Sequence, residues 1–100
     1  MGKATLEFYL KEDVQKQFLM EIKLYSIDRD PRFPDGAKYS LIFLNKKTGE
    51  RVLFDNHHPK GHHYHLDKME YAYDFSDVST LIEDFKKAIY QKFGVRLWKN

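Results

Sequence analysis

The stretch DVSTLIEDFKKAIYQKFG, residues 77–94, decides the fold. Asp77 is a residue type favoured at a helix N-cap, and Gly94 suits the left-handed position that follows a helix. Between them, apolar residues recur every three or four positions and form one stripe, made of Val78, Leu81, Ile82, Phe85, Ile89 and Phe93. Such a stripe must be buried against another element. The sequence therefore predicts one helix that packs on a sheet.

Upstream of this helix, apolar and polar residues alternate, which is typical of strands. Five runs show the pattern, at residues 6–10, 18–24, 38–44, 51–55 and 69–75. The run at 38–44 is apolar on both faces, which predicts an inner strand covered on both sides. Polar turns at 11–17 and 45–50 predict two hairpins. We therefore predict an α+β fold, in which one C-terminal helix packs on one face of an antiparallel sheet of about five strands.

The length and composition indicate one domain that spans residues 1–100. The chain has no cysteine, which excludes disulfides and cysteine zinc sites and fits a reducing compartment. No apolar run is long enough for a signal segment or a membrane span, so we expect a cytoplasmic protein without membrane contact. The net charge of +2 does not by itself indicate a nucleic-acid binder. For the tail at 95–100 two alternatives remain, a short edge strand or packing of Leu97 and Trp98 on the helix.

All five histidines lie in one segment, FDNHHPKGHHYHL at residues 54–66. If this segment is extended, His63 and His65 share one face, with Cβ atoms roughly 7 Å apart. Two imidazoles at that spacing can flank a phosphate, one removing a 2′-hydroxyl proton of RNA and the other protonating the leaving oxygen. Lys60 would stabilise charge on the phosphoryl oxygens, and Gly61 would let the backbone approach an anion.

Two other interpretations of the same segment remain open. A His-x-His pair on a strand also offers two nitrogens to zinc. A magnesium centre is disfavoured because only Asp55 and Asp67 flank the histidines. In the second of these interpretations, the segment is only a solvated loop that happens to be rich in histidine. His57 and His58 are the histidines least expected to take part in chemistry.

Further residues are candidates for orienting or contacting RNA. Asp55 or Asn56 would orient an imidazole or the substrate. Tyr71 and Tyr73 have rings that can stack on a base, although aromatic residues on strands more often belong to a core. Arg29 and Arg32, in a loop rich in proline at residues 28–36, can bind phosphate, although such charges are usually only solvated. The predicted RNA contacts are Asn56, Gly61, Tyr73 and Arg29.

The sequence resembles the TumE family of prokaryotic toxin–antitoxin toxins. The resemblance is carried by Asp55-Asn56, Lys60-Gly61, His63-x-His65-Leu66 and Leu81-Ile82-x-Asp84-Phe85, with Glu70 and Tyr73-x-Phe75 between them. It implies a growth-inhibiting toxin whose partner is a cognate antitoxin, typically a helix-turn-helix protein. Toxins of this size are often ribonucleases. The extra histidines at 57, 58 and 62 depart from the family pattern.

The leading hypothesis is a metal-independent endoribonuclease toxin without a cofactor, in which His63, His65, Lys60 and Asp55 are the catalytic residues. The runner-up is a non-enzymatic module that binds nucleic acid or a partner protein through the same loop. A zinc-binding domain that uses His63 and His65 is the third hypothesis. Sheet edges at the first strand or the tail further predict pairing between subunits in a homodimer.

Overall fold

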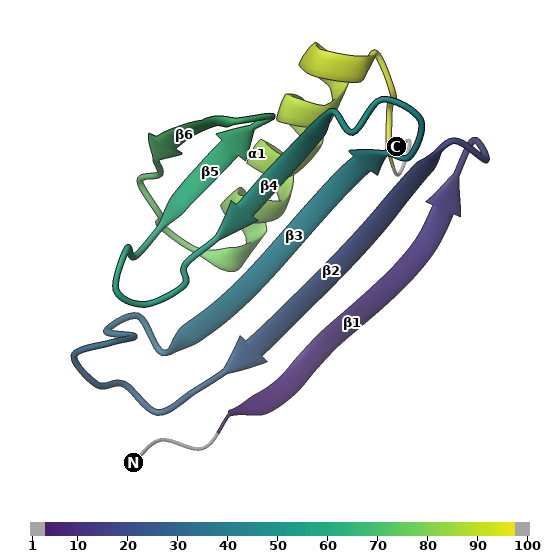
Figure 1. Cartoon of the computed structure of the whole chain (residues 1–100). Coiled ribbons are helices and arrows are strands. Elements are labelled where there is room, and N and C mark those ends of the chain that lie inside the picture. Colours follow the sequence, from purple (N-terminus) through teal and green to yellow (C-terminus); the bar gives the residue numbers. More distant parts are fainter. Residues whose placement is uncertain (1–3, 98–100) are drawn as a thin grey trace.

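The computed structural model describes residues 4–97 and shows six strands followed by one helix (Figure 1). Each strand pairs antiparallel with the next one in the chain, so the sheet order is β1-β2-β3-β4-β5-β6. The elements are β1 (Thr5–Val14), β2 (Phe18–Ser26), β3 (Ala37–Asn45), β4 (Arg51–Asp55), β5 (His63–Leu66), β6 (Met69–Ala72) and α1 (Val78–Phe93). The predicted α+β fold is confirmed, with one strand more than expected. The histidine segment itself supplies that strand, β5.

The helix α1 has the predicted caps and the predicted apolar stripe. The Asp77 carboxylate accepts a hydrogen bond of 2.7 Å from the backbone N–H of Thr80. Gly94 has a φ of 70°, and its N–H donates to the Tyr90 carbonyl at 2.8 Å. These bonds satisfy backbone groups that a helix leaves open at its two ends.

One face of the sheet carries the core, and α1 lies behind the half of the sheet that contains β4, β5 and β6 (Figure 1). The core is formed by alternate residues of the inner strands, one side of α1 and the tail. Its buried members include Met20, Ile22, Leu41, Phe43, Val52, Phe54, Leu81, Phe85, Ile89, Val95 and Leu97. The tail therefore packs into the core at Leu97, and residues 95–97 form no strand. Trp98 lies outside the described residues.

The opposite face of the sheet has no helix over it in the part of the chain that the structure describes. On β3, Tyr39 and Leu41 are buried on the helix side, whereas Ile42 and Leu44 on the other side are only half-buried. The expectation that this strand is covered on both sides is thus wrong, because a single helix covers a single face. None of the described helices is long and apolar enough to cross a membrane.

Two strand boundaries also differ from the prediction. β1 continues to Val14 instead of ending before Lys11, and the turn consists of residues 15–17, in which Gln15 and Lys16 have φ values of 51° and 64°. β1 lies at the sheet edge, where polar side chains face solvent, so its polar end does not alternate with apolar residues. At the other edge β6 stops at Ala72. Tyr73 then leaves the sheet, and its hydroxyl donates to Asp84 on α1 at 2.6 Å.

Candidate functional site

The helix-free face of β4 and β5 carries the predicted catalytic side chains. Asp55 pairs with His63 across the two strands, and Leu53 pairs with His65. Because side chains alternate along a strand, Tyr64 and Leu66 point to the helix side and the two histidines point away from it. The imidazole rings of His63 and His65 lie with their centroids 5.0 Å apart, which confirms that they share a face.

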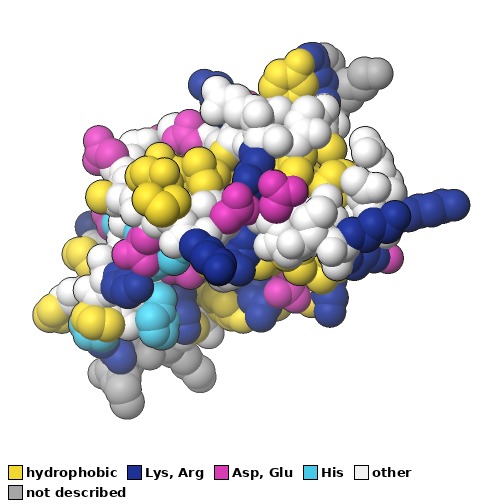
Figure 2. Space-filling view, turned by 45° about the horizontal axis from the view of Figure 1, so that its top comes forward, with side chains coloured by type: hydrophobic (Ala, Val, Ile, Leu, Met, Phe, Trp, Pro, Cys, Tyr) yellow, Lys and Arg dark blue, Asp and Glu magenta, His cyan; other side chains and the backbone are white. Residues whose placement is uncertain are grey.

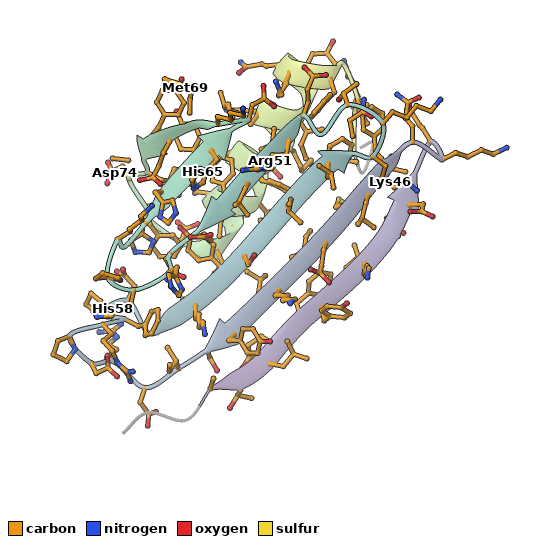
Figure 3. All side chains as sticks on the ribbon, in the orientation of Figure 1. Lys46, Arg51, His58, His65, Met69 and Asp74 are labelled. Carbon is orange, nitrogen blue, oxygen red and sulfur yellow. The ribbon has the colours of Figure 1, made fainter. Side chains whose placement is uncertain are left out.

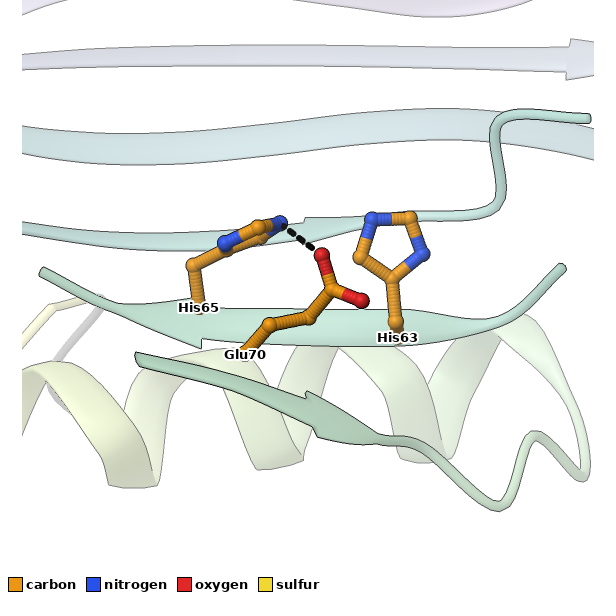
Figure 4. A group of neighbouring side chains, drawn as sticks. All are labelled: His63, His65 and Glu70. Carbon is orange, nitrogen blue, oxygen red and sulfur yellow. Dashed lines mark ion pairs between the residues drawn. The ribbon is translucent and has the colours of Figure 1, made fainter. Parts of the chain in front are cut away.

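The strand β6 adds Glu70 to this face (Figure 4), next to His65 on β5, which Figure 3 labels. Glu70 lies opposite His65 in the β5–β6 pair, and its Oε1 is 3.4 Å from His65 Nε2. The Lys60 ammonium, from the turn between β4 and β5, donates to the same oxygen at 2.8 Å. Lys60 and Glu70 therefore form an ion pair beside the imidazoles, with side chains 58% and 39% exposed.

This ion pair shifts the pKa values of both Lys60 and Glu70. The hydrogen bond from Lys60 is the largest cause of the lowered pKa of Glu70, and the charges of His63 and His65 add to it. The bond to Glu70 in turn raises the pKa of Lys60. Glu70 is accordingly a carboxylate and Lys60 an ammonium at neutral pH.

His63 is the most enclosed member of the group, with a side chain only 7% exposed. Its Nδ1 donates to the Gly61 carbonyl at 2.8 Å, and its Nε2 lies 2.9 Å from Asp55 Oδ1. A carbonyl oxygen only accepts hydrogen bonds, so Nδ1 carries a proton and Nε2 faces the Asp55 carboxylate. The left-handed φ of 75° at Gly61 belongs to the turn that brings this carbonyl to the ring.

Glu70 was not predicted as a site residue, and the only carboxylates that the sequence placed beside the histidines were Asp55 and Asp67. Asp67 occupies the β5–β6 turn, where its carboxylate accepts from the Arg51 N–H at 2.8 Å and from Lys92 at 2.6 Å. The signal that could have found Glu70 is the hairpin itself. A tight turn at 67–68 places residue 70 opposite residue 65.

The other three histidines lie outside this group. The Tyr39 hydroxyl is 2.9 Å from His62 Nδ1, and Asp35 Oδ2 is 2.7 Å from its Nε2. The His62 ring also stacks on Phe75, with centroids 4.6 Å apart and planes 1° from parallel. His62 thus packs within the fold, whereas His57 and His58 are exposed on the turn.

The predicted RNA contacts are scattered, and only Gly61 lies beside the cluster. Asn56 is buried, where its amide accepts from the Tyr39 N–H at 2.9 Å and donates to the Ala37 carbonyl at 2.8 Å. Tyr73 lies on the helix side of the sheet, and burial is the largest cause of its raised pKa. Arg29 is exposed in the loop before β3.

That loop borders the turn that carries the histidines. Residues 31–35 line a cavity of about 250 Å³ together with Asn56, His58, Pro59, Gly61 and His62. Arg32, in the same loop, is held by Asp30 at 3.3 Å. The loop is therefore a neighbour of the cluster, and its arginines do not reach the imidazoles through any contact that the described residues show.

The fold and the cluster define a small α+β domain with two imidazoles, two carboxylates and an ammonium on its helix-free face. Figure 2 shows histidines beside basic and acidic side chains at one end of the molecule. Residues 4–93 match the family described as Toxin TumE. The chain belongs to the TumE toxin family, which implies a cognate antitoxin as its partner. No curated protein and no solved structure matches the chain.

Proposed function

We propose that this toxin is an endoribonuclease that cleaves RNA by general acid–base catalysis without a metal ion. One observation carries the proposal. His63, His65, Glu70, Lys60 and Asp55 come from three strands and a turn and converge on one face of the sheet. Groups that accept protons, donate protons and neutralise an anion thus lie within reach of a single phosphate.

His65 and Glu70 are the proposed base. The carboxylate lies 3.4 Å from the His65 Nε2 and stays charged next to Lys60, so it can hold the ring in position and share its proton. The side chain of His65 is 18% exposed, which leaves an edge of the ring open to a substrate. The pair would remove the proton from a ribose 2′-hydroxyl, whose oxygen then attacks the neighbouring phosphorus.

His63 is the proposed acid. The Gly61 carbonyl fixes the orientation of its ring, and the Asp55 carboxylate lies 2.9 Å from its Nε2, where it would stabilise an imidazolium that donates a proton. The imidazolium would give its Nε2 proton to the departing 5′-oxygen, which leaves a 5′-hydroxyl on one product and a 2′,3′-cyclic phosphate on the other. Asp55 acts as a positioning residue that stabilises the charged ring.

Lys60 is the proposed binding group for the phosphate. Its ammonium is exposed and, within residues 4–97, pairs only with exposed Glu70, and such ion pairs are weak enough for a phosphate to replace the carboxylate. A cation next to the phosphoryl oxygens would stabilise the charge that grows on them in the transition state. Two predictions on partners remain, a helix-turn-helix protein as the antitoxin and RNA as the substrate. The predicted place of action is the cytoplasm.

The test is cleavage of total cellular RNA in EDTA by the wild type and by His63→Ala, His65→Ala and Glu70→Gln. We expect each variant to lose about 10²- to 10⁴-fold in rate, the usual contribution of a positioned acid or base. His57→Ala, which changes an exposed histidine of the same turn, is the matched control and should retain full activity. Circular dichroism of every variant separates lost chemistry from lost folding.

Two results would overturn the proposal. If the wild type leaves RNA intact, the ribonuclease assignment fails. Binding of RNA that weakens with salt but never shortens the RNA would then favour a non-enzymatic binding module. If the wild type cleaves but folded His65→Ala and Glu70→Gln cleave equally well, the chemistry lies elsewhere on the molecule.

A further inference from the structure

Three side chains of the cluster direct ligand atoms toward one point. One nitrogen each from His63 and His65 and one Glu70 oxygen all lie within 4.8 Å of one another. Figure 4 shows the Glu70 carboxylate between the two rings. We propose that these three residues bind a single transition-metal ion of the Zn²⁺ class, and that the bound ion switches off RNA cleavage.

The spacing of the ligand atoms suits such an ion. Two ligands about 2.1 Å from zinc in a tetrahedral arrangement lie roughly 3.4 Å apart. The distance from His65 Nε2 to Glu70 Oε1 is already 3.4 Å. The third ligand atom lies within 4.8 Å of the other two, so it needs a closure of at most about 1.4 Å, which a side-chain rotation can supply.

The orientation of the His63 ring favours metal binding. An imidazole that binds a metal with one nitrogen usually donates the N–H of the other to a backbone carbonyl, which fixes the tautomer. His63 makes this bond from Nδ1 to the Gly61 carbonyl at 2.8 Å. Nε2 is therefore the nitrogen left for a metal ion, and the turn at Gly61 holds the ring in place in advance.

The carboxylates of the cluster are stabilised by nearby positive charge, and a divalent metal ion would supply such charge at a single point. A second carboxylate borders the same ring, since Asp55 lies 2.9 Å from His63 Nε2. Glu70 is held by the Lys60 ammonium at 2.8 Å. A divalent ion on His63 Nε2 and Glu70 would neutralise these carboxylates and take the place of the ammonium on Glu70. Lys60 is 58% exposed and can move into solvent at little cost.

The donor set selects the class of ion. Imidazole nitrogens suit Zn²⁺, Co²⁺, Ni²⁺ and Cu²⁺, whereas Mg²⁺ and Ca²⁺ prefer sites made of oxygen. Two histidines and one glutamate form a known set of three protein ligands for zinc, with a fourth position left for water. We therefore expect Zn²⁺ to bind and Mg²⁺ not to bind.

Inhibition follows from the same contacts, and this part of the inference rests on the proposed function. A metal ion on His65, Glu70 and His63 occupies the lone pairs of the base and removes the proton from the acid. RNA cleavage would then fall as the site fills. Binding itself does not depend on the proposed function and is measured separately.

The test is a titration of metal-free protein with CoCl₂, followed by the visible absorption of four- or five-coordinate Co²⁺, and with ZnCl₂ followed by calorimetry. We expect one ion per chain, no heat with MgCl₂, and a loss of affinity of at least about tenfold in His65→Ala and Glu70→Gln. The matched control is His57→Ala/His58→Ala, which removes two exposed histidines of the same turn and should bind as the wild type does. Circular dichroism checks that each variant is folded.

The outcomes separate this inference from the proposed function. Wild-type affinity in folded Glu70→Gln and His65→Ala, or lost binding in the control variant, overturns the site. Cleavage in EDTA that one equivalent of Zn²⁺ stops supports both the site and its effect, whereas cleavage unaffected by bound Zn²⁺ overturns the switch alone. If the wild type never cleaves RNA, the proposed function fails, and the titration still decides whether the metal site exists.

Discussion

The two faces of the strand β5 differ in what holds their side chains. On the helix side, the Tyr64 ring stacks on Phe54 with centroids 5.0 Å apart and belongs to the packed core. On the helix-free side, His63 and His65 are held by hydrogen bonds and charges from Asp55, Gly61 and Glu70. The packed face supplies stability, which leaves the helix-free face free to carry polar groups. Changes on the two faces should therefore have separable effects.

The largest effect on stability is expected from the centre of the helix side. Phe85 is fully buried, so Phe85→Ala should lower the free energy of unfolding by about 3–5 kcal/mol. His65→Ala on the other face should lower it by less than about 1 kcal/mol. Urea denaturation measures both. Equal losses in the two variants would contradict the division between the faces.

A smaller loss of stability is expected from a change of Asn56, which directly follows β4. The buried Asn56 amide bridges the Tyr39 N–H and the Ala37 carbonyl, so it joins the end of β4 to the start of β3. Asn56→Ala leaves both backbone groups without this partner and should cost about 2 kcal/mol. Thermal denaturation measures the loss. If Asn56→Ala melts at the same temperature as the wild type, the structural role is contradicted and contact with RNA stays the predicted role of Asn56.

The turn between β5 and β6 should make a small contribution to stability that depends on pH. Lys92 and the Arg51 N–H lower the pKa of Asp67 in the folded protein. The resulting stability is present above the unfolded pKa of about 3.9 and is lost as pH falls through the lower folded pKa. Because Asp67 is 41% exposed, we expect about 0.5 kcal/mol.

The matched change for this turn is Asp67→Asn, which removes the charge but can accept the bond from Arg51 and tolerates the φ of 58°. Wild type should be the more stable protein at pH 7, and the two proteins should converge below the folded pKa. Urea titrations across this pH range measure the difference. A difference that persists unchanged at the lowest pH would show that charge is not its cause.

The smallest change in stability is expected at the β1 edge. Phe8 is 46% exposed, so Phe8→Lys should change the free energy of unfolding by less than about 0.5 kcal/mol. A lysine on an edge strand opposes pairing between chains, so the same variant should abolish the predicted homodimer. Sedimentation at increasing concentration tests this, and a wild type that remains monomeric would contradict the dimer.

Most of the fold was predictable because it depends on local patterns. The caps at Asp77 and Gly94 and the turn at Gly49 are each determined by neighbours in sequence. β5 was not counted as a strand although His-Tyr-His-Leu alternates. The reason is that the residues on its helix-free face are histidines, which give a weaker polar signal than charged residues do. β1 was predicted to end too early because its last residues are polar, and an edge strand tolerates polar residues on both faces.

The site was only half predictable because part of it depends on strand register. That His63 and His65 share a face follows from their spacing alone. Glu70 joins them only through the pairing of β5 with β6, and Asp67 leaves them because it occupies the turn. Asn56 and Tyr73 were both predicted to contact RNA, but Asn56 is buried and the Tyr73 hydroxyl bonds to Asp84 on α1.

The most direct test of the account is the chemistry of the RNA ends that the wild type produces in EDTA. Attack by the ribose 2′-hydroxyl predicts 2′,3′-cyclic phosphate and 5′-hydroxyl ends, and no cleavage of an RNA that carries 2′-deoxyribose at the scissile position. Mass spectrometry of a short defined RNA identifies both ends. Products with 3′-hydroxyl and 5′-phosphate ends, or cleavage of the deoxyribose substrate, would contradict acid–base catalysis by the helix-free face.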